Sequence, residues 1–252
     1  MDNGNIKVII LTVMSVKILG ESYDINEIEL DLTNKAISEL PESIGKLVNL
    51  RGLCLSYNGL KKLPKSIGEL INLKNLRLYN NQLKNLPESI GNLINLIFLS
   101  LDTNQLTNLP ESIGKLVNLK GLHLHNNQLT TLPESIGKLI NLTYLYLNNN
   151  QLTTLPESIG RLVNLTYLSL ECNQLKNLPK SILNIKNSLK MYVSSYEINN
   201  LSEDTEFLIF TCLNEELTNL PTGLKEIFIG ERNKNEKLNH KLPFGCVIKY
   251  YE

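Results

Sequence analysis

Apolar and polar residues alternate along most of this chain within a unit of 23 residues. The clearest copy begins at Leu142 and follows the pattern LxxLxLxxNxLxxLPxSIGxLxN; equivalent copies begin at Leu50, Leu73, Leu96, Leu119 and Leu165. A fixed period of this length is typical of stacked supersecondary units, each too small to bury its own apolar face. The pattern therefore predicts one elongated array of repeats.

The LxLxxN part of each unit predicts a short strand. Its two leucines, for example Leu99 and Leu101, alternate with polar residues, and this period of two buries one face of a strand. Stacked copies should then form a parallel sheet. The leucines would point into the array, and the residues between them would form an outward-facing concave surface.

The other positions that recur from copy to copy of the unit predict turns. Each asparagine, such as Asn150, lies where the chain leaves the strand, and its amide can bond backbone groups that the sheet leaves unpaired. Pro-Glu-Ser-Ile-Gly follows at Pro41, Pro87, Pro110, Pro133 and Pro156, with Pro-Lys-Ser-Ile at Pro64 and Pro179. Proline predicts an extended segment, and glycine permits a tight helical turn on the convex side. We interpret these columns as structural and assign no catalytic or binding role to them.

The repeats divide the chain into three parts. About eight units of 23 residues occupy 27–202, with residues 1–26 predicted to form an N-terminal cap and shorter, degenerate coils over 203–252 a C-terminal cap. Residues 8–16 are apolar enough for the core of a signal peptide, but no small-residue cleavage site follows them. They are also too few for the roughly 20 residues of a membrane span. A cleaved signal remains the alternative to a cap.

These motifs resemble the leucine-rich repeat family, and the 23-residue unit is similar to its intracellular Ras-group class. The resemblance implies an α/β repeat fold, a right-handed horseshoe-shaped solenoid with a parallel concave sheet and short helical or 3-10 turns on the convex side. It also implies a scaffold for signalling proteins. The C-terminal coils, such as Leu-Pro-Thr-Gly from Leu220, resemble Leu-Pro-x-Gly repeats in proteins of amoebae and large DNA viruses.

Charge and cysteine content narrow the functional classes. The 25 basic and 25 acidic residues give no net charge, which removes the electrostatic case for nucleic acid or a membrane surface as the partner. The four cysteines are scattered and form no CxxC pair, so a reducing, cytoplasmic location is favoured. No phosphate-binding loop, nucleophile elbow or dinucleotide fingerprint occurs, and we expect neither an enzyme nor a cofactor.

The outward strand positions carry the candidate site. They gather six of the ten tyrosines and two of the three histidines, which is a composition typical of protein-binding surfaces. Solvated aromatics that merely suit a sheet are the competing interpretation. The predicted partner-binding residues are Tyr57, Arg77, Tyr79, Phe98, Asp102, His123, His125, Tyr144, Tyr146, Tyr167, Glu171 and Tyr192.

Two of these residues raise further hypotheses. Asp102 and His125 occupy the same column of adjacent strands, so a pair between them would let the histidine charge tune partner affinity near neutral pH. Together with His123 they could form a metal or hydrolytic site, although a flat sheet spreads side chains apart. A metal is therefore not predicted.

The sequence thus predicts a non-enzymatic scaffold that binds another protein through its concave sheet. The family resemblance suggests a signalling protein as partner, or a host protein if the chain is viral. The alternatives are a metal-binding or hydrolytic protein built on His123, His125 and Asp102, and a secreted recognition receptor. The identity of the partner and the oligomeric state are not encoded in these patterns.

Overall fold

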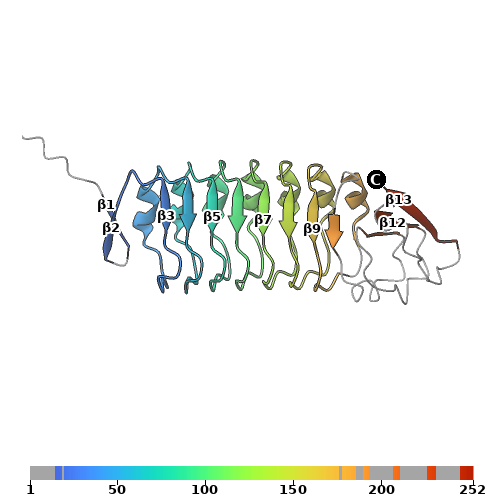
Figure 1. The fold of residues 1–252 in the computed structure, drawn as a ribbon, viewed down its shortest axis with the longest axis horizontal. Helices are drawn as coiled ribbons and strands as arrows, with labels where there is room; N and C mark the ends of the chain where they lie inside the picture. The colour runs from blue at the N-terminus through green and yellow to red at the C-terminus, as the bar shows by residue number, and fades with distance from the viewer. Residues whose placement is uncertain are drawn as a thin grey trace, which may run out of the picture.

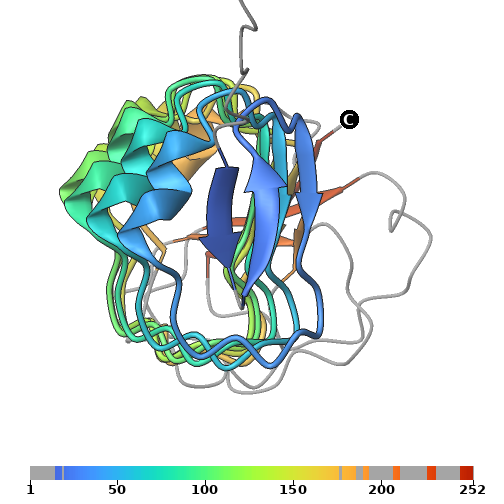
Figure 2. The ribbon, with the colours of Figure 1, turned by 90° about the vertical axis from the view of Figure 1, so that its left-hand side faces the viewer.

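The repeats stack into one elongated solenoid, as predicted (Figure 1). The computed structural model describes residues 15–18, 20–175, 178–185, 190–192, 207–210, 226–230 and 245–251. Each repeat runs from a strand on one side, through an extended segment, to a short helix on the other side. Figure 2 looks along the stack and shows the strands and the helices on opposite sides of the cross-section.

Eight strands form one parallel sheet in the order β10-β9-β8-β7-β6-β5-β4-β3, so the predicted sheet is confirmed. Each of these strands is three residues long, and hydrogen bonds between successive repeats continue beyond it, for example from the N–H of Leu101 to the carbonyl oxygen of His123. The middle residues, from Leu30 to Met191, are buried in every strand. The strands are β3 (Glu29–Asp31), β4 (Gly52–Cys54), β5 (Asn75–Arg77), β6 (Phe98–Ser100), β7 (Gly121–His123), β8 (Tyr144–Tyr146), β9 (Tyr167–Ser169) and β10 (Lys190–Tyr192).

In the described part of the chain, seven 3-10 helices cover the other side of the core. Each begins directly after the proline of the repeat, whose extended backbone precedes the turn, and its isoleucine is buried. The helices are η1 (Glu42–Lys46), η2 (Lys65–Glu69), η3 (Glu88–Asn92), η4 (Glu111–Lys115), η5 (Glu134–Lys138), η6 (Glu157–Arg161) and η7 (Lys180–Asn184). The predicted convex turns are therefore confirmed as 3-10 helices.

The buried asparagine column bonds the turns of successive repeats to one another. The side-chain oxygen of Asn127 accepts a hydrogen bond from the backbone N–H of Leu106 at 2.9 Å. Its amide nitrogen donates to the carbonyl oxygens of Leu101 and Leu124, both at 3.0 Å. The same bonds recur at Asn58, Asn81, Asn104 and Asn150, so the column satisfies backbone groups that the short strands leave unpaired.

A second asparagine column, at the last position of the repeat pattern, lies on the surface where each helix leads back to the sheet. Asn118 donates from its side-chain nitrogen to the carbonyl oxygen of Ile94 in the preceding repeat at 2.8 Å. Asn72, Asn95 and Asn141 make the equivalent bond at 2.9 Å. Because these asparagines are exposed, water can replace the bond, and each contributes less than a buried counterpart.

The glycine of Ser-Ile-Gly is required by close packing between repeats. A Cβ atom on Gly114 would lie 2.5 Å from the carbonyl oxygen and 2.6 Å from the Cβ atom of Ser135 in the next repeat. Positive φ occurs only at Gly20 and Gly245 among the described glycines. We expected the glycine to serve the tight turn itself. The structure instead shows that it allows adjacent helices to touch.

We expect Gly114→Ala and Ser135→Ala to have different effects on stability. The added methyl group at Gly114 has no space and should lower the free energy of unfolding by about 2 kcal/mol. The Ser135 hydroxyl is buried without a hydrogen-bond partner, so removing it should change that free energy by less than about 1 kcal/mol. Urea denaturation followed by circular dichroism measures both, and equal losses would contradict this packing.

The two ends of the solenoid carry additional sheets. The hairpin of β1 (Ser15–Ile18) and β2 (Glu21–Asp24) places Val16 and Ile18 in the hydrophobic core beside the first repeat. Three parallel strands, β11 (Phe207–Phe210), β12 (Glu226–Gly230) and β13 (Val247–Tyr251), follow the last repeat. Most residues of the two predicted caps, including residues 1–14, lie outside the described part of the chain. Within the described residues, no helix is long and apolar enough to cross a membrane.

Candidate functional site

The parallel register arranges the outward side chains of the sheet into columns across the repeats. Phe98, Gly121, Tyr144 and Tyr167 are successive members of the first column. Ser100, His123, Tyr146 and Ser169 follow each other in the next outward column. Because neighbouring strands lie only about 4.8 Å apart, large side chains in these columns must contact each other. We call this sheet surface the concave face.

An aromatic cluster crosses the concave face from β6 to β9. The ring centroid of His123 lies 4.8 Å from that of Phe98 and 4.4 Å from that of Tyr146, both in edge-to-face geometry. Tyr146 continues to Tyr167 at 4.6 Å, and His125 lies 6.1 Å from Tyr146. Such contacts hold aromatic rings in fixed orientations. The aromatic cluster, consisting of Phe98, His123, His125, Tyr146 and Tyr167, is therefore a preformed surface.

Gly121 makes room for one member of the aromatic cluster. A Cβ atom at this position would lie 2.9 Å from the Phe98 ring, which leans over the glycine and against His123. Glycine in a strand often marks such a close approach. Our sequence reasoning overlooked Gly121, although a glycine among aromatic neighbours in its column was a readable signal. Because position 121 has no side chain, the Phe98 ring on the neighbouring strand can lie over it and contact His123.

His125 and Asp102 lie close together, as the column alignment predicted. The His125 Nε2 atom is 3.6 Å from the Asp102 Oδ2 atom, a close electrostatic contact that is too long for a strong hydrogen bond. Asp102 is held in place by the Ser100 hydroxyl, which donates to its other oxygen at 2.6 Å. The His125 Nδ1 atom is buried, and no described group bonds to it.

The described residues contain no group of three or more potential metal ligands. His123 packs its ring between Phe98 and Tyr146, whereas His125 faces Asp102. The two histidine ring centroids are 6.2 Å apart and their planes are tilted by 52°. This arrangement favours packing over convergence on one ion.

A second aromatic pair lies just after the neighbouring strands β4 and β5. Tyr57 and Tyr79 make an edge-to-face contact with ring centroids 5.0 Å apart. Tyr57 does not lie on the strand, as we assumed, but on the turn that follows it, with φ at 55°. The equivalent positions in other repeats include Asn80, Asn126 and Asn149, a residue type that tolerates this conformation better than tyrosine does.

The other predicted residues are dispersed around these two groups. Arg77 lies close enough to Asp31 to help lower its pKa, after the larger effect of the hydrogen bonds from Thr33. Tyr144 is 48% exposed and stands beside Tyr167 in register. Glu171 accepts a hydrogen bond from Ser169 at 2.6 Å. Tyr192 ends β10, and its side chain lies outside the described part.

Comparison with known proteins agrees with this geometry. A family model described as a leucine-rich repeat region matches residues 29–96 and 80–150, and a model of two leucine-rich repeats matches 140–190. A solved structure of a leucine-rich repeat protein from Leptospira interrogans is 30% identical, with a TM-score of 0.52, and the match covers 89% of this chain and 74% of that one. The chain belongs to the leucine-rich repeat family. No curated protein matches it.

Family membership separates the structural columns of the repeat from the residues peculiar to this chain. Leucine-rich repeats share the buried leucines and the asparagine column, which the structure places in the core and its turns. The aromatic cluster occupies positions that the repeat leaves variable. On its concave face, this leucine-rich repeat protein therefore differs from a generic repeat array by the aromatic cluster.

The partly buried position of His123 predicts a pH dependence of stability. Burial lowers the pKa of His123, the nearby Asp102 carboxylate opposes this effect, and His125 adds a smaller lowering. The unfolded chain takes up a proton near the ordinary value of about 6.5, whereas the folded chain resists it. We therefore expect the free energy of unfolding to fall as the pH drops below about 6.5.

A variant tests this assignment. His123→Phe keeps an aromatic ring between Phe98 and Tyr146 but cannot be protonated. Urea denaturation at pH 7.5, 6.0 and 5.0 should show a smaller loss of stability in the variant than in the wild type. Identical pH profiles for the two proteins would show that His123 does not contribute to the pH dependence of stability.

Proposed function

We propose that this protein is a non-enzymatic scaffold that binds another protein through the aromatic cluster on its concave face. The observation that carries the proposal is the set of ring contacts from Phe98 to Tyr167, which presents a rigid, half-exposed surface across four strands. Aromatic side chains fixed before binding lose little conformational entropy when a partner covers them. Leucine-rich repeat proteins typically serve as such scaffolds, which supports the proposal.

The polar groups around the cluster suit protein recognition. Tyrosine hydroxyls and the histidine rings can form hydrogen bonds at the rim, while the ring faces supply apolar contact. The Asp102 and Glu171 carboxylates flank the cluster on either side, each held by a serine hydroxyl. Fixed carboxylates of this kind would select a partner with basic or hydroxyl groups opposite them.

The finer aspects of the proposal rest on the repeat itself and on cysteine content. The 23-residue unit is similar to that of intracellular Ras-group scaffolds, so we propose a signalling protein as the partner, or a host protein if the chain is viral. Cys54 and Cys172 are free cysteines, which is compatible with a cytoplasmic location. We further propose that 1–26 and 203–252 cap the two ends of the repeats.

Affinity capture from a cell lysate with three matched baits tests the proposal. The baits are the wild type, the concave variant Tyr146→Ser, Tyr167→Ser, and the control Ile140→Ser, Val163→Ser, whose exposed aliphatic residues lie away from the concave face. We expect the wild type and the control to retain the same proteins, and the concave variant to lose at least one of them. Identical sets from all three baits would contradict the proposal.

A further inference from the structure

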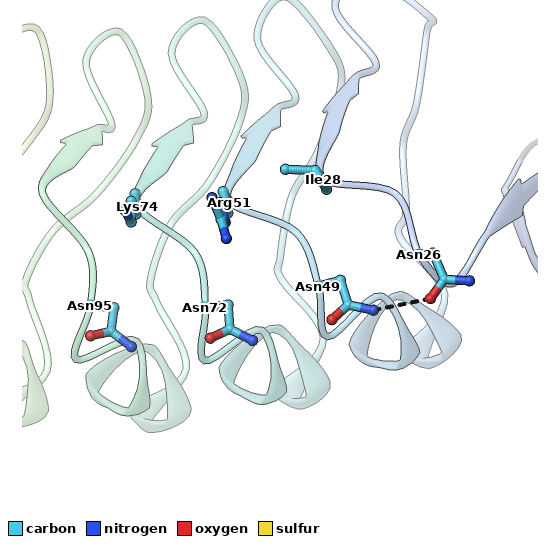
Figure 3. A pocket seen from close by; sticks show the side chains of 7 residues that line it. All are labelled: Asn26, Ile28, Asn49, Arg51, Asn72, Lys74 and Asn95. Atoms are coloured by element: carbon cyan, nitrogen blue, oxygen red, sulfur yellow. Dashed lines mark hydrogen bonds between the residues drawn. The ribbon is translucent and has the colours of Figure 1, made fainter.

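A groove of about 540 Å³ runs along the edge of the first repeats, outside the aromatic cluster. Figure 3 shows its two walls: asparagines beside the 3-10 helices form one, and the residues that lead into the strands form the other. Asn26, Asn49, Asn72 and Asn95 line the first wall. Ile28, Arg51 and Lys74 line the second.

The second wall places two cations next to each other in register. The backbone N–H of Lys74 donates to the carbonyl oxygen of Arg51 at 2.7 Å, so the two side chains leave adjacent rungs of one ladder. Like charges directly opposite each other destabilise a sheet. Among the residues that the structure describes, no carboxylate lies within ion-pair distance of either cation. Both charged residues that line the groove are thus positive and lack a counterion.

Apolar residues bound the cation pair on both sides. The N–H of Arg51 donates to the carbonyl oxygen of Ile28 at 2.7 Å, and that of Ile97 to Lys74 at 2.8 Å. Ile28 is 51% exposed and Ile97 is 37% exposed. Ile28 therefore lies beside the cation pair within the groove, and Ile97 lies beside it just beyond the residues that line the groove.

The asparagine wall offers free hydrogen-bond acceptors. Asn72 and Asn95 use their side-chain nitrogens to bond the carbonyl oxygens of Val48 and Ile71. Their side-chain oxygens accept no bond in the described part of the chain. An extended peptide has unpaired backbone N–H groups that such oxygens can accept. Adjacent rungs of this wall lie about 4.8 Å apart, and same-face side chains of an extended peptide lie roughly 7 Å apart, so two such side chains can face the cation pair.

We propose that this groove binds an extended acidic segment of a protein, with two carboxylates on one face of the segment opposite Arg51 and Lys74 and aliphatic side chains on the same face at either end. In an extended peptide, side chains two residues apart point the same way. The complementary sequence therefore has two acidic side chains two residues apart on one face, with an apolar side chain on that face at either end. This site is independent of the partner proposed for the aromatic cluster.

Fluorescence anisotropy with a labelled peptide tests the proposal. The probe is Leu-Ser-Glu-Ser-Glu-Ser-Leu, and the control peptide carries glutamine in place of both glutamates. We expect saturable binding of the acidic peptide to the wild-type protein and binding at least tenfold weaker for the glutamine peptide. The double variant Arg51→Gln, Lys74→Gln should also weaken binding of the acidic peptide about tenfold.

A variant with the same change in net charge separates a specific site from general attraction. Lys115→Gln, Lys138→Gln removes two exposed cations from the ends of η4 and η5, on the side opposite the sheet. Unchanged affinity of this control supports the proposal, and an equal loss overturns it. Absence of saturable binding to the wild type overturns it as well. So does tighter binding of single-stranded DNA or of anionic lipid vesicles at the same groove, because the groove would then select a different class of polyanion.

Discussion

Asn127→Ala should lower the free energy of unfolding by about 3 kcal/mol. The side chain is buried and bonds backbone groups of two successive repeats, at Leu106, Leu101 and Leu124. Alanine would leave these groups unpaired in a site that is too enclosed for free exchange with water, and each unpaired group adds to the loss. Denaturation in urea, followed by far-ultraviolet circular dichroism, measures the change.

Asn118→Ala is the matched control for this variant. It also removes an asparagine side chain, from the last position of the preceding repeat, but Asn118 is exposed and makes one bond, to the carbonyl oxygen of Ile94. We expect a loss below about 1 kcal/mol, because water can take over that bond. Similar losses for the two variants would show that burial does not determine how much each asparagine column contributes to the free energy of unfolding.

Tyr146→Ala, Tyr167→Ala should weaken binding of a partner captured by the wild-type protein about a hundredfold. Central aromatic residues of an interface commonly lose 2 kcal/mol or more each on truncation, and a factor of 100 corresponds to roughly 2.7 kcal/mol. The two rings contact each other at 4.6 Å, so their single effects should not simply add. Isothermal titration calorimetry of both single variants and the double variant measures this coupling.

The control for the affinity prediction must alter a surface of similar exposure elsewhere. Ile140 and Val163 are 51% and 41% exposed, and Ile140→Ala, Val163→Ala should leave the dissociation constant within about twofold of the wild type. Both double variants should unfold cooperatively, since neither removes a fully buried residue. A larger effect of the control than of the concave variant would place the interface on another face.

The repeat pattern was sufficient to predict the solenoid because each column has one physical role in every copy. Leu122 is buried for the same reason as Leu99 and Leu145, so a single alignment assigns the core of all strands. The same alignment correctly placed Asp102 opposite His125. Residues at equivalent positions of successive repeats lie side by side in a parallel sheet, so the repeat alignment is enough to identify such neighbours.

Features that depend on side-chain orientation or on contacts between turns could not be predicted in this way. The Phe98 ring leans over Gly121, and this choice among rotamers depends on the absence of a side chain one repeat away. The contact between Gly114 and Ser135 depends on how closely the 3-10 helices approach, which the motif does not specify. The groove beside Arg51 and Lys74 was overlooked because its two walls come from different columns of the repeat.

Site-specific photo-crosslinking tests the central claim, that the concave face binds a protein partner, most directly. A benzophenone amino acid placed at Tyr144, which is 48% exposed on the concave face, is compared with the same group at Ile140, which is 51% exposed away from it. Irradiation in a cell lysate followed by mass spectrometry should yield a defined crosslinked protein from position 144 and none from position 140. A crosslink from position 140 with none from position 144 would contradict recognition through the concave face.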